Sequence, residues 1–306
     1  MNKHTFLQFE LWKDCNNKCK FCFNNNATTS VQSKIERLNF VADKIQDIPK
    51  GITRIGFIGG EFFDGQLKDD RVLMKFISIL NEVLNNDKIE QVLITTSLIY
   101  KDYKWLSYVL HYLTHLEKLM ICTSWDTKYR FHNVEAQIWW ENNVSWLRQT
   151  YPQIKVHVEI CPTQWHIEDV LNNKFNITKF EQYFDVQVDY TDLNSGFNYA
   201  DKYEFQKAVP GFFPKRETFL NFLQKVYSEG QATSSKFLNF ENMSTLLWMD
   251  AGRGYELFEG YRGPTDGETV DDNYLLPPMH ENKSDYIDSH VRMRKDVIDI
   301  WENMYE

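Results

Sequence analysis

The sequence lacks a paired cysteine framework, a long apolar run and an excess of basic residues. Three of its five cysteines fall within eight residues, while Cys122 and Cys161 stand singly, which excludes a secreted disulfide scaffold. No apolar run approaches the ~20 residues that cross a bilayer, and residues 1–5 do not begin a secretory signal. We therefore expect a cytoplasmic protein without a membrane partner.

The charge balance narrows the classes of partner. A net charge of -9 at pH 7 disfavours a broad nucleic-acid surface, because such a surface needs clustered basic side chains. The chain has 306 residues, of which 42% are apolar and 15% aromatic. This is enough for one α/β barrel with an appendage or for two modest domains.

The clustered cysteines are Cys15, Cys19 and Cys22, separated by three and then two residues. On a short irregular loop, three thiolates can ligate one iron-sulfur cluster and leave one iron free. Structural zinc takes four protein ligands, usually two close pairs, and the chain contains no second pair. A zinc shell completed by His4 or a distant histidine, or three unligated thiols, remains an alternative.

Apolar runs alternate with helix-like segments, which predicts an α/β fold with a parallel sheet and right-handed crossovers. The expected strands are residues 5–12, 53–58, 91–96, 118–123, 155–160 and 185–190. The expected helices are residues 31–46, 71–84, 103–115, 135–150 and 164–171. After about residue 200 the alternation weakens. There we expect helices at residues 215–228 and 284–305, and a loop at 250–272.

Several strands have one apolar and one polar set of alternating residues. Apolar sets such as Leu7, Phe9 and Leu11 should pack on helices, so the polar sets should line an enclosed space. Unpaired buried polar groups are costly, which favours a ligand chamber over a dry core. The substrate candidates from these sets are Glu10, His157, Glu159, Gln187 and Asp189. Alternatively, some lie at hydrated strand ends, or His157 is a hydrogen-bonded core residue.

Residues 14–24 (DCNNKCKFCFN) resemble the cluster loop of the radical S-adenosylmethionine (SAM) superfamily, including Phe21 before the third cysteine. The resemblance implies a [4Fe-4S] cluster whose open iron chelates SAM. It also implies a protein reductant, whose electron cleaves SAM to a 5′-deoxyadenosyl radical that takes hydrogen from the substrate. The cofactors then carry the difficult chemistry, and the protein supplies placement.

Further motifs follow in the family's order. Gly59-Gly60-Glu61 is similar to the Gly-Gly-Glu motif after the second strand, and Ser124-Trp125-Asp126 to a Ser-Leu-Asp segment with a trailing arginine. The resemblance assigns these positions to SAM binding. It adds the Thr-rich strand end, which is Thr95, Thr96 and Ser97 here, and the trailing arginine, which is Arg130. Alternatively, the Thr-Ser run reflects strand propensity, Asp126 is a cap and Arg130 a surface residue.

The family resemblance implies an incomplete (β/α)6 TIM-like barrel over residues 1–200, with its site at the strand C-terminal ends. Residues 201–306 would form a mostly helical and loop extension that packs on the barrel and shapes the substrate site. In its loop, Arg253 and Arg262 are candidates for a substrate phosphate or carboxylate. Cys122 and Cys161 are candidate hydrogen donors, although a lone strand cysteine is more often a small buried hydrophobe.

No cysteine follows Cys161, so the cysteine-rich extension of many peptide-modifying relatives is missing. We therefore expect a nucleotide, nucleoside or other small molecule as substrate rather than a peptide. Trp125, Trp165 and Trp248 could stack on a base, although such residues more often build cores. The alternatives are a degenerate member that only binds or regulates, and a non-catalytic zinc protein. The substrate, electron donor and oligomeric state do not follow from the sequence.

Overall fold

A computed structural model gives the fold. It describes residues 4–17, 19, 28–46, 48, 52–190, 218, 221–222, 225–226, 245–250 and 257–260, and the statements below concern these residues. The side chains of residues 4–5, 189–190, 245–250 and 257–260 are outside the description.

Six parallel strands form the centre of one open sheet. They are β1 (His4–Glu10), β2 (Arg54–Ile58), β3 (Gln91–Thr95), β4 (Leu119–Trp125), β5 (Lys155–Ile160) and β6 (Gln187–Tyr190). The sheet order is β6-β5-β4-β3-β2-β1-β7-β8, so the six strands lie side by side in chain order, as an incomplete barrel requires. The predicted fold class is confirmed, and the sheet is not closed.

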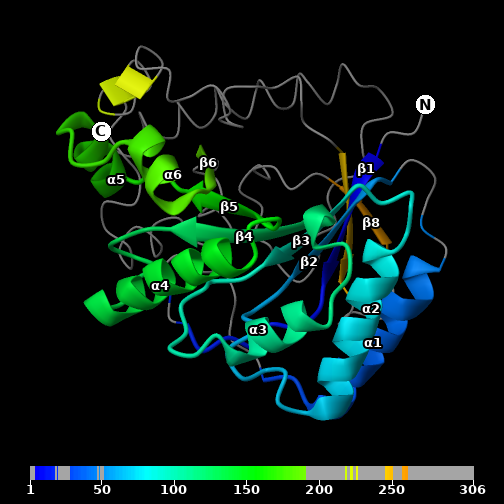
Figure 1. Cartoon of the computed structure of the whole chain (residues 1–306). Helices are drawn as coiled ribbons and strands as arrows, with labels where there is room; N and C mark the ends of the chain where they lie inside the picture. The colour runs from blue at the N-terminus through cyan, green and yellow to red at the C-terminus, as the bar shows by residue number, and fades with distance from the viewer. Residues whose placement is uncertain are drawn as a thin grey trace, which may run out of the picture.

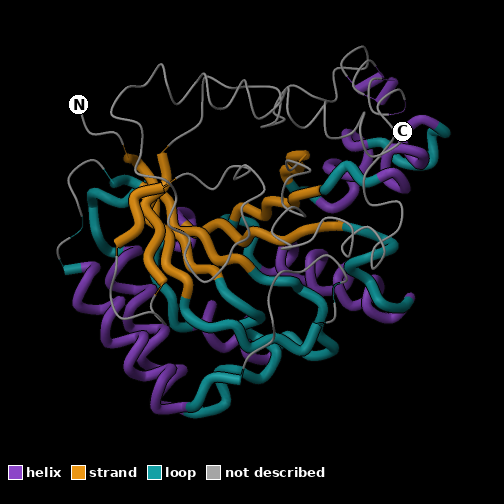
Figure 2. Tube along the Cα trace, turned by 180° about the vertical axis from the view of Figure 1, so that it is seen from behind, coloured by secondary structure: helices purple, strands orange, loops and turns teal. Residues whose placement is uncertain are grey.

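Helices follow the strands, and Figures 1 and 2 show α1 to α4 along one face of the sheet. They are α1 (Val31–Ile45), α2 (Asp70–Leu84), α3 (Lys104–His111), α4 (Val134–Thr150), α5 (Gln164–Leu171) and α6 (Ile177–Phe184), with a 3-10 turn at Leu116–Lys118. Short polar side chains cap five of the six helices at their N-termini: Ser30, Asp69, Asn133, Thr163 and Asn176. No helix in the described residues has the length and apolar character needed to span a bilayer.

The main core lies between this helical layer and the apolar face of the sheet. Leu7, Phe9 and Leu11 have no exposed surface, and Val158 and Ile160 of β5 are equally buried. The apolar halves of these strands therefore pack in the core, as the alternation predicts. The polar halves face the opposite side of the sheet.

The structure adds three elements that the sequence pattern did not predict. Helix α6 follows α5 after a short turn, with Asn176 accepting a hydrogen bond from the Lys179 amide. Strand β7 (Thr245–Asp250) pairs with β1 in parallel, and β8 (Leu257–Gly260) pairs with β7 antiparallel. The expectation of a loop throughout residues 250–272 is therefore wrong at β8. Residues 257–260 form a strand because they pair with β7, and their local glycine and charge content does not indicate this pairing.

Other predictions for the C-terminal part are tested only in places. The described residues between 215 and 228, namely 218, 221–222 and 225–226, are helical. The predicted helix at 284–305 lies outside the described residues. Because β7 pairs with β1, residues 245–250 share a sheet with the N-terminal strands. The division at residue 200 stays a prediction.

Trp125 belongs to the core. It is 7% exposed, and its ring lies 4.8 Å from Trp140, 5.0 Å from Phe131 and 5.1 Å from Phe180 between centroids. It is therefore not available for stacking on a base. Trp165 is 44% exposed, with the Lys128 ammonium over its ring. Trp248 lies in β7, and its side chain is outside the description.

Replacing Trp125 by Ala should lower the free energy of unfolding by about 3–5 kcal/mol, because the cavity removes contacts with three aromatic rings. Trp165→Ala is the matched control and should cost no more than about 1 kcal/mol, since it loses one exposed cation–π contact. Denaturant unfolding followed by circular dichroism measures both. Equal losses in the two variants would contradict this account of the core.

Candidate functional site

The cysteine loop begins on a tight backbone contact with the Gly-Gly turn after β2. The Gly60 amide donates to the Trp12 carbonyl at 2.7 Å, and the Glu61 amide donates to the Asp14 carbonyl at 2.8 Å. A Cβ at Gly59 would lie 2.3 Å from the Trp12 oxygen, and one at Gly60 would lie 1.9 Å from the Asp14 oxygen. Only glycine allows this approach, so the two motifs are packed directly against each other.

Cys15 and Cys19 are partly exposed thiols at the C-terminal end of β1. The Cys19 sulfur lies 3.9 Å from the Arg130 carbonyl oxygen, which brings the loop beside the segment after β4. Cys22 and Phe21 lie outside the described residues. Within the described part, which lacks Cys22, no three metal-ligating side chains are grouped, so the ligand set itself stays a prediction.

A buried ion pair fastens both ends of the cysteine loop. The Lys34 ammonium lies 3.3 Å from an Asp14 carboxylate oxygen, and the side chains are 7% and 6% exposed. The same oxygen, Asp14 Oδ1, accepts a hydrogen bond from the Thr29 amide at 2.9 Å. Lys34 Nζ also donates to Gln66 at 2.9 Å and lies 5.2 Å from the Trp12 ring centroid. We refer to the Asp14, Thr29 and Lys34 contacts as the loop clamp.

Glu61 is 1% exposed, and its carboxylate is fully engaged by the protein. Oε1 accepts from the Phe63 amide at 3.0 Å and the Thr96 hydroxyl at 2.7 Å, and Oε2 accepts from the Ser97 amide at 2.5 Å. Burial raises the pKa of Glu61, and these hydrogen bonds act in the opposite direction. The carboxylate thus joins the Gly-Gly turn to the end of β3.

The segment after β3 also contacts the cysteine loop. Asn17 donates to the Ser97 hydroxyl oxygen at 2.8 Å, and the Ile99 amide donates to the same atom at 3.1 Å. Thr96 and Ser97 are buried, whereas Thr95 is partly exposed. The structure therefore brings the Thr-Ser end of β3 into contact with the cysteine loop after β1, across the intervening strand β2.

After β4, Asp126 is 7% exposed and accepts at Oδ1 from the amides of Lys128 (2.9 Å), Tyr129 and Arg130 (3.3 Å). Burial raises the pKa of Asp126, against these hydrogen bonds. The carboxylate therefore caps a turn, which is the structural alternative of the sequence analysis. Ser124 is partly exposed. Arg130 is partly buried, and its Nε has no acceptor among the described residues.

The polar face contains the substrate candidates in register. Thr95, Cys122, His157 and Gln187 are paired across neighbouring strands, and Ser124, Glu159 and Asp189 form the next row. Glu10, Cys122 and His157 are buried at 7%, 8% and 6% exposure, Glu159 is partly buried, and Gln187 is exposed. Cys161 is 8% exposed. The side chain of Asp189, and Arg253 and Arg262 altogether, lie outside the description.

Sequence reasoning missed Asp14, Asn17, Lys34 and Arg54. Lys34 falls on the apolar face of α1, four residues before Leu38 and seven before Val41, and this misplaced charge was the available signal. Asp14 directly precedes Cys15, but only the fold shows that it meets Lys34 and Thr29. Asn17 and Arg54 gave no local signal.

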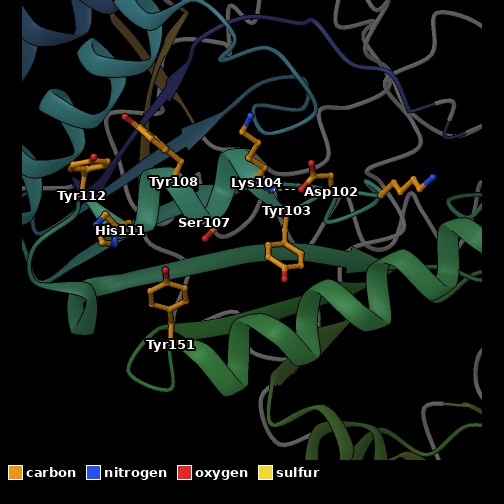
Figure 3. Close-up of a pocket in the computed structure, with 9 residues that line it drawn as sticks. Asp102, Tyr103, Lys104, Ser107, Tyr108, His111, Tyr112 and Tyr151 are labelled. Atoms are coloured by element: carbon orange, nitrogen blue, oxygen red, sulfur yellow. Dashed lines mark hydrogen bonds between the residues drawn. The ribbon is translucent and has the colours of Figure 1, made fainter.

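A separate surface pocket lies outside the strand-end site. Figure 3 shows the residues that line it, which come from α3, from the segments on either side of α3, and from Tyr151 after α4. The pocket has a volume of about 820 Å³. Its rim includes Lys101 and Lys104. None of the cysteine-loop or strand-end residues described above lines it, so the pocket is not part of the candidate site.

Comparison with known families matches residues 7–134 to the 4Fe-4S single cluster domain. This stretch begins in β1, passes through the cysteine loop and ends at the start of α4, and so includes every motif described above. The match covers less than half of the chain and agrees with the predicted [4Fe-4S] cluster in this part of it. A comparison with curated protein sequences finds no match.

Comparison with solved structures gives distant similarities. SuiB of Streptococcus suis bound to S-adenosylmethionine is 13% identical, with a TM-score of 0.47, over 84% of this chain and 63% of that one. A second SuiB structure is 14% identical, with a TM-score of 0.46, and the match covers 81% of this chain and 59% of that one. Methylornithine synthase (PylB) is 14% identical, with a TM-score of 0.41, and the match covers 62% of this chain and 53% of that one. The similarity spans less than two thirds of each of these proteins and is too distant to transfer a substrate.

The loop clamp leads to a test of cluster retention. Replacing Lys34 by Met leaves the Asp14 carboxylate buried without its cation, which should destabilise the fold by about 3–5 kcal/mol. The reconstituted variant should hold less iron per protein and lose its visible absorbance to a chelator faster than the wild type.

Lys44→Met is the matched control, because Lys44 is an exposed lysine on the same helix. Lys34→Arg keeps the charge and should recover part of the iron retention. Wild-type iron content and bleaching rate in Lys34→Met would show that the clamp does not hold the cluster loop.

Proposed function

We propose that this chain is a radical SAM enzyme, which cleaves S-adenosylmethionine at a [4Fe-4S] cluster and starts radical chemistry on a small-molecule or nucleotide-type substrate. The family match over residues 7–134, and the order of the motifs at the ends of β1 to β4, support the membership. The observation that carries the proposal is the direct packing of the cysteine loop on the Gly-Gly-Glu turn.

Cys15, Cys19 and Cys22 would hold the cluster. Two observations support the fit of these residues to a cluster. Cys15 and Cys19 are partly exposed thiols after a strand end, and the flanks of their loop are fixed by Gly60, Glu61 and the loop clamp. When bound, the cluster supplies the electron that cleaves SAM to a 5′-deoxyadenosyl radical, and the open iron is the place for the SAM amino and carboxylate groups.

The residues proposed for SAM are Gly59, Gly60, Glu61, Thr95, Thr96, Ser97, Ser124, Asp126 and Arg130. Arg130 fits an anionic group best, because its buried Nε has no acceptor among the described residues and its backbone lies beside Cys19. Glu61 and Asp126 already accept hydrogen bonds from the protein, so we assign them a positioning role. They hold the segments that would face SAM.

The polar face of the sheet would receive the substrate. Glu10, His157 and Glu159 lie on it, and Cys122 and Cys161 are the proposed hydrogen donors. The proposed substrate residues also include Gln187, Asp189, Arg253 and Arg262. A reductant protein would deliver the electron, and the C-terminal part of the chain would shape the substrate site.

The reaction class is tested with anaerobically reconstituted protein, a chemical reductant and SAM. Wild-type protein should contain iron, absorb visible light and release 5′-deoxyadenosine, detected by liquid chromatography and mass spectrometry. Replacing Cys15, Cys19 and Cys22 together by Ala should remove the iron and the product, because no other grouped thiols remain.

The control replaces Cys122 and Cys161 by Ala, which should leave the iron content unchanged, since both are buried singly. A full iron complement in the triple variant would refute the ligand assignment. Iron-loaded wild type that never yields 5′-deoxyadenosine would favour a binding or regulatory protein that keeps the fold.

Glu61→Gln tests the positioning role. Whichever way the amide is turned, its NH₂ group faces a backbone N–H, that of Phe63 or that of Ser97, so one buried donor pair is mismatched. SAM affinity should fall about tenfold, equivalent to about 1.4 kcal/mol, while iron content stays the same. Equilibrium binding of SAM to the oxidised protein measures this. Glu90→Gln, an exposed change beside β3, is the control; unaltered SAM affinity in Glu61→Gln would remove Glu61 from the site.

A further inference from the structure

Arg54 stands on the polar face of the sheet, and no acidic side chain among the described residues pairs with it. It is the first residue of β2 and pairs in register with Phe6 of β1 and Gln91 of β3. It shares a sheet face with Cys122 and His157, and Cys122 lies within electrostatic range of its guanidinium. A cation thus enters the space that contains the proposed substrate residues.

Within the described part of the chain, the guanidinium of Arg54 contacts the Phe6 ring and has no ion pair. Its carbon lies 5.1 Å from the Phe6 ring centroid, and the Phe6 ring lies over Gly56. A Cβ at Gly56 would come within 2.8 Å of that ring, so glycine makes room for Phe6 to support Arg54. We refer to Phe6, Arg54 and Gly56 as the arginine platform.

The five described arginines fall into two groups. Arg71 and Arg148 pair with Asp69 and Asp185, and Arg37 donates to the Leu11 carbonyl at 2.7 Å. Arg54 and Arg130, in contrast, have a buried Nε without an acceptor among the described residues. Arg130 is next to the cysteine loop, whereas Arg54 is at the opposite end of the strands.

Arg54 is partly buried, with a buried Nε, and such a charge without a counter-ion is unfavourable unless a ligand supplies one. Burial lowers the pKa of Arg54, but an arginine stays protonated at neutral pH, so its charge persists. The planar guanidinium matches carboxylate and phosphate oxygens in pairs, and the cation–π contact with Phe6 helps to hold it in place.

We propose that the arginine platform binds the oxyanion of the substrate, a phosphate or a carboxylate, at the end of the polar face farthest from the cluster loop. The proposal rests on the proposed function for the position of the cluster. Arg54 and Ile58 are four residues apart along β2, about 13 Å at ~3.3 Å per residue. A substrate held at Arg54 would therefore place a group several bonds away from its anion at the reacting end, as a nucleotide or a phosphorylated or carboxylated small molecule can.

The test uses arginine modification of the reconstituted, oxidised full chain without reductant, so its outcome does not depend on SAM cleavage. Phenylglyoxal labels accessible arginines, and peptide mass spectrometry gives the labelling rate at each one. We expect inorganic phosphate or succinate to slow labelling of Arg54 several-fold and to leave the exposed Arg71 unchanged. Phosphate protection identifies a phosphorylated substrate, and protection by succinate alone identifies a carboxylate.

SAM forms a separate arm. It should protect Arg130 and leave Arg54 accessible, and protection of Arg54 by SAM would overturn the assignment to the substrate. The assignment would also be overturned if neither phosphate nor succinate slows the labelling of Arg54. If SAM does not protect Arg130, but phosphate or succinate still protects Arg54, the result would count against the SAM site and not against the platform.

Two variants probe the platform itself, with phosphate affinity measured by calorimetry. Arg54→Met should weaken binding of the protecting anion about tenfold or more. Gly56→Ala should weaken it while the charge is kept, because the added methyl displaces Phe6. Arg71→Met is the control and should bind as the wild type does. Unchanged affinity in both platform variants, with wild-type unfolding temperatures, would refute the proposal.

Discussion

The site depends on the contact between the backbone of residues 12–14 and the two glycines after β2. Two amide–carbonyl hydrogen bonds and the absence of two Cβ atoms set where the cysteine loop leaves the sheet. Glu61 extends the same contact to the end of β3, and Asn17 returns from the loop to Ser97. Three strand ends are thus connected through short, buried polar contacts, which is how side chains far apart in sequence come to one edge.

Much of this arrangement follows from sequence. The predicted strands at residues 53–58, 91–96 and 155–160 agree with β2, β3 and β5 within one residue, because each is a strongly apolar run bounded by turn or capping residues. The strand-end motifs were found because the chain order of a parallel sheet places them on one edge. The split of β1 into buried Leu7 and Phe9 and the polar Gln8 and Glu10 also followed from alternation.

Other features could not be found in this way. Lys34, Asp14 and Arg54 acquire their roles through partners on other elements, and a single chain without its fold does not show such pairs. The pairing of β7 with β1 could not be predicted for the same reason, because local sequence does not indicate which distant strand is the partner. The family resemblance assigns Glu61 to SAM, and only the fold shows that its oxygens accept hydrogen bonds from Phe63, Thr96 and Ser97.

The loop clamp bears on how three cysteines of one loop are brought to a single cluster. Asp14 and Thr29 lie 15 positions apart and meet at 2.9 Å, so the segment that contains all three clustered cysteines is closed into a ring by protein contacts alone. Closing a flexible loop of this length costs on the order of 2 kcal/mol in chain entropy. The Asp14 and Thr29 contact offsets part of that cost, because it holds the two flanks of the loop together and so raises the effective concentration of the three thiols around one cluster.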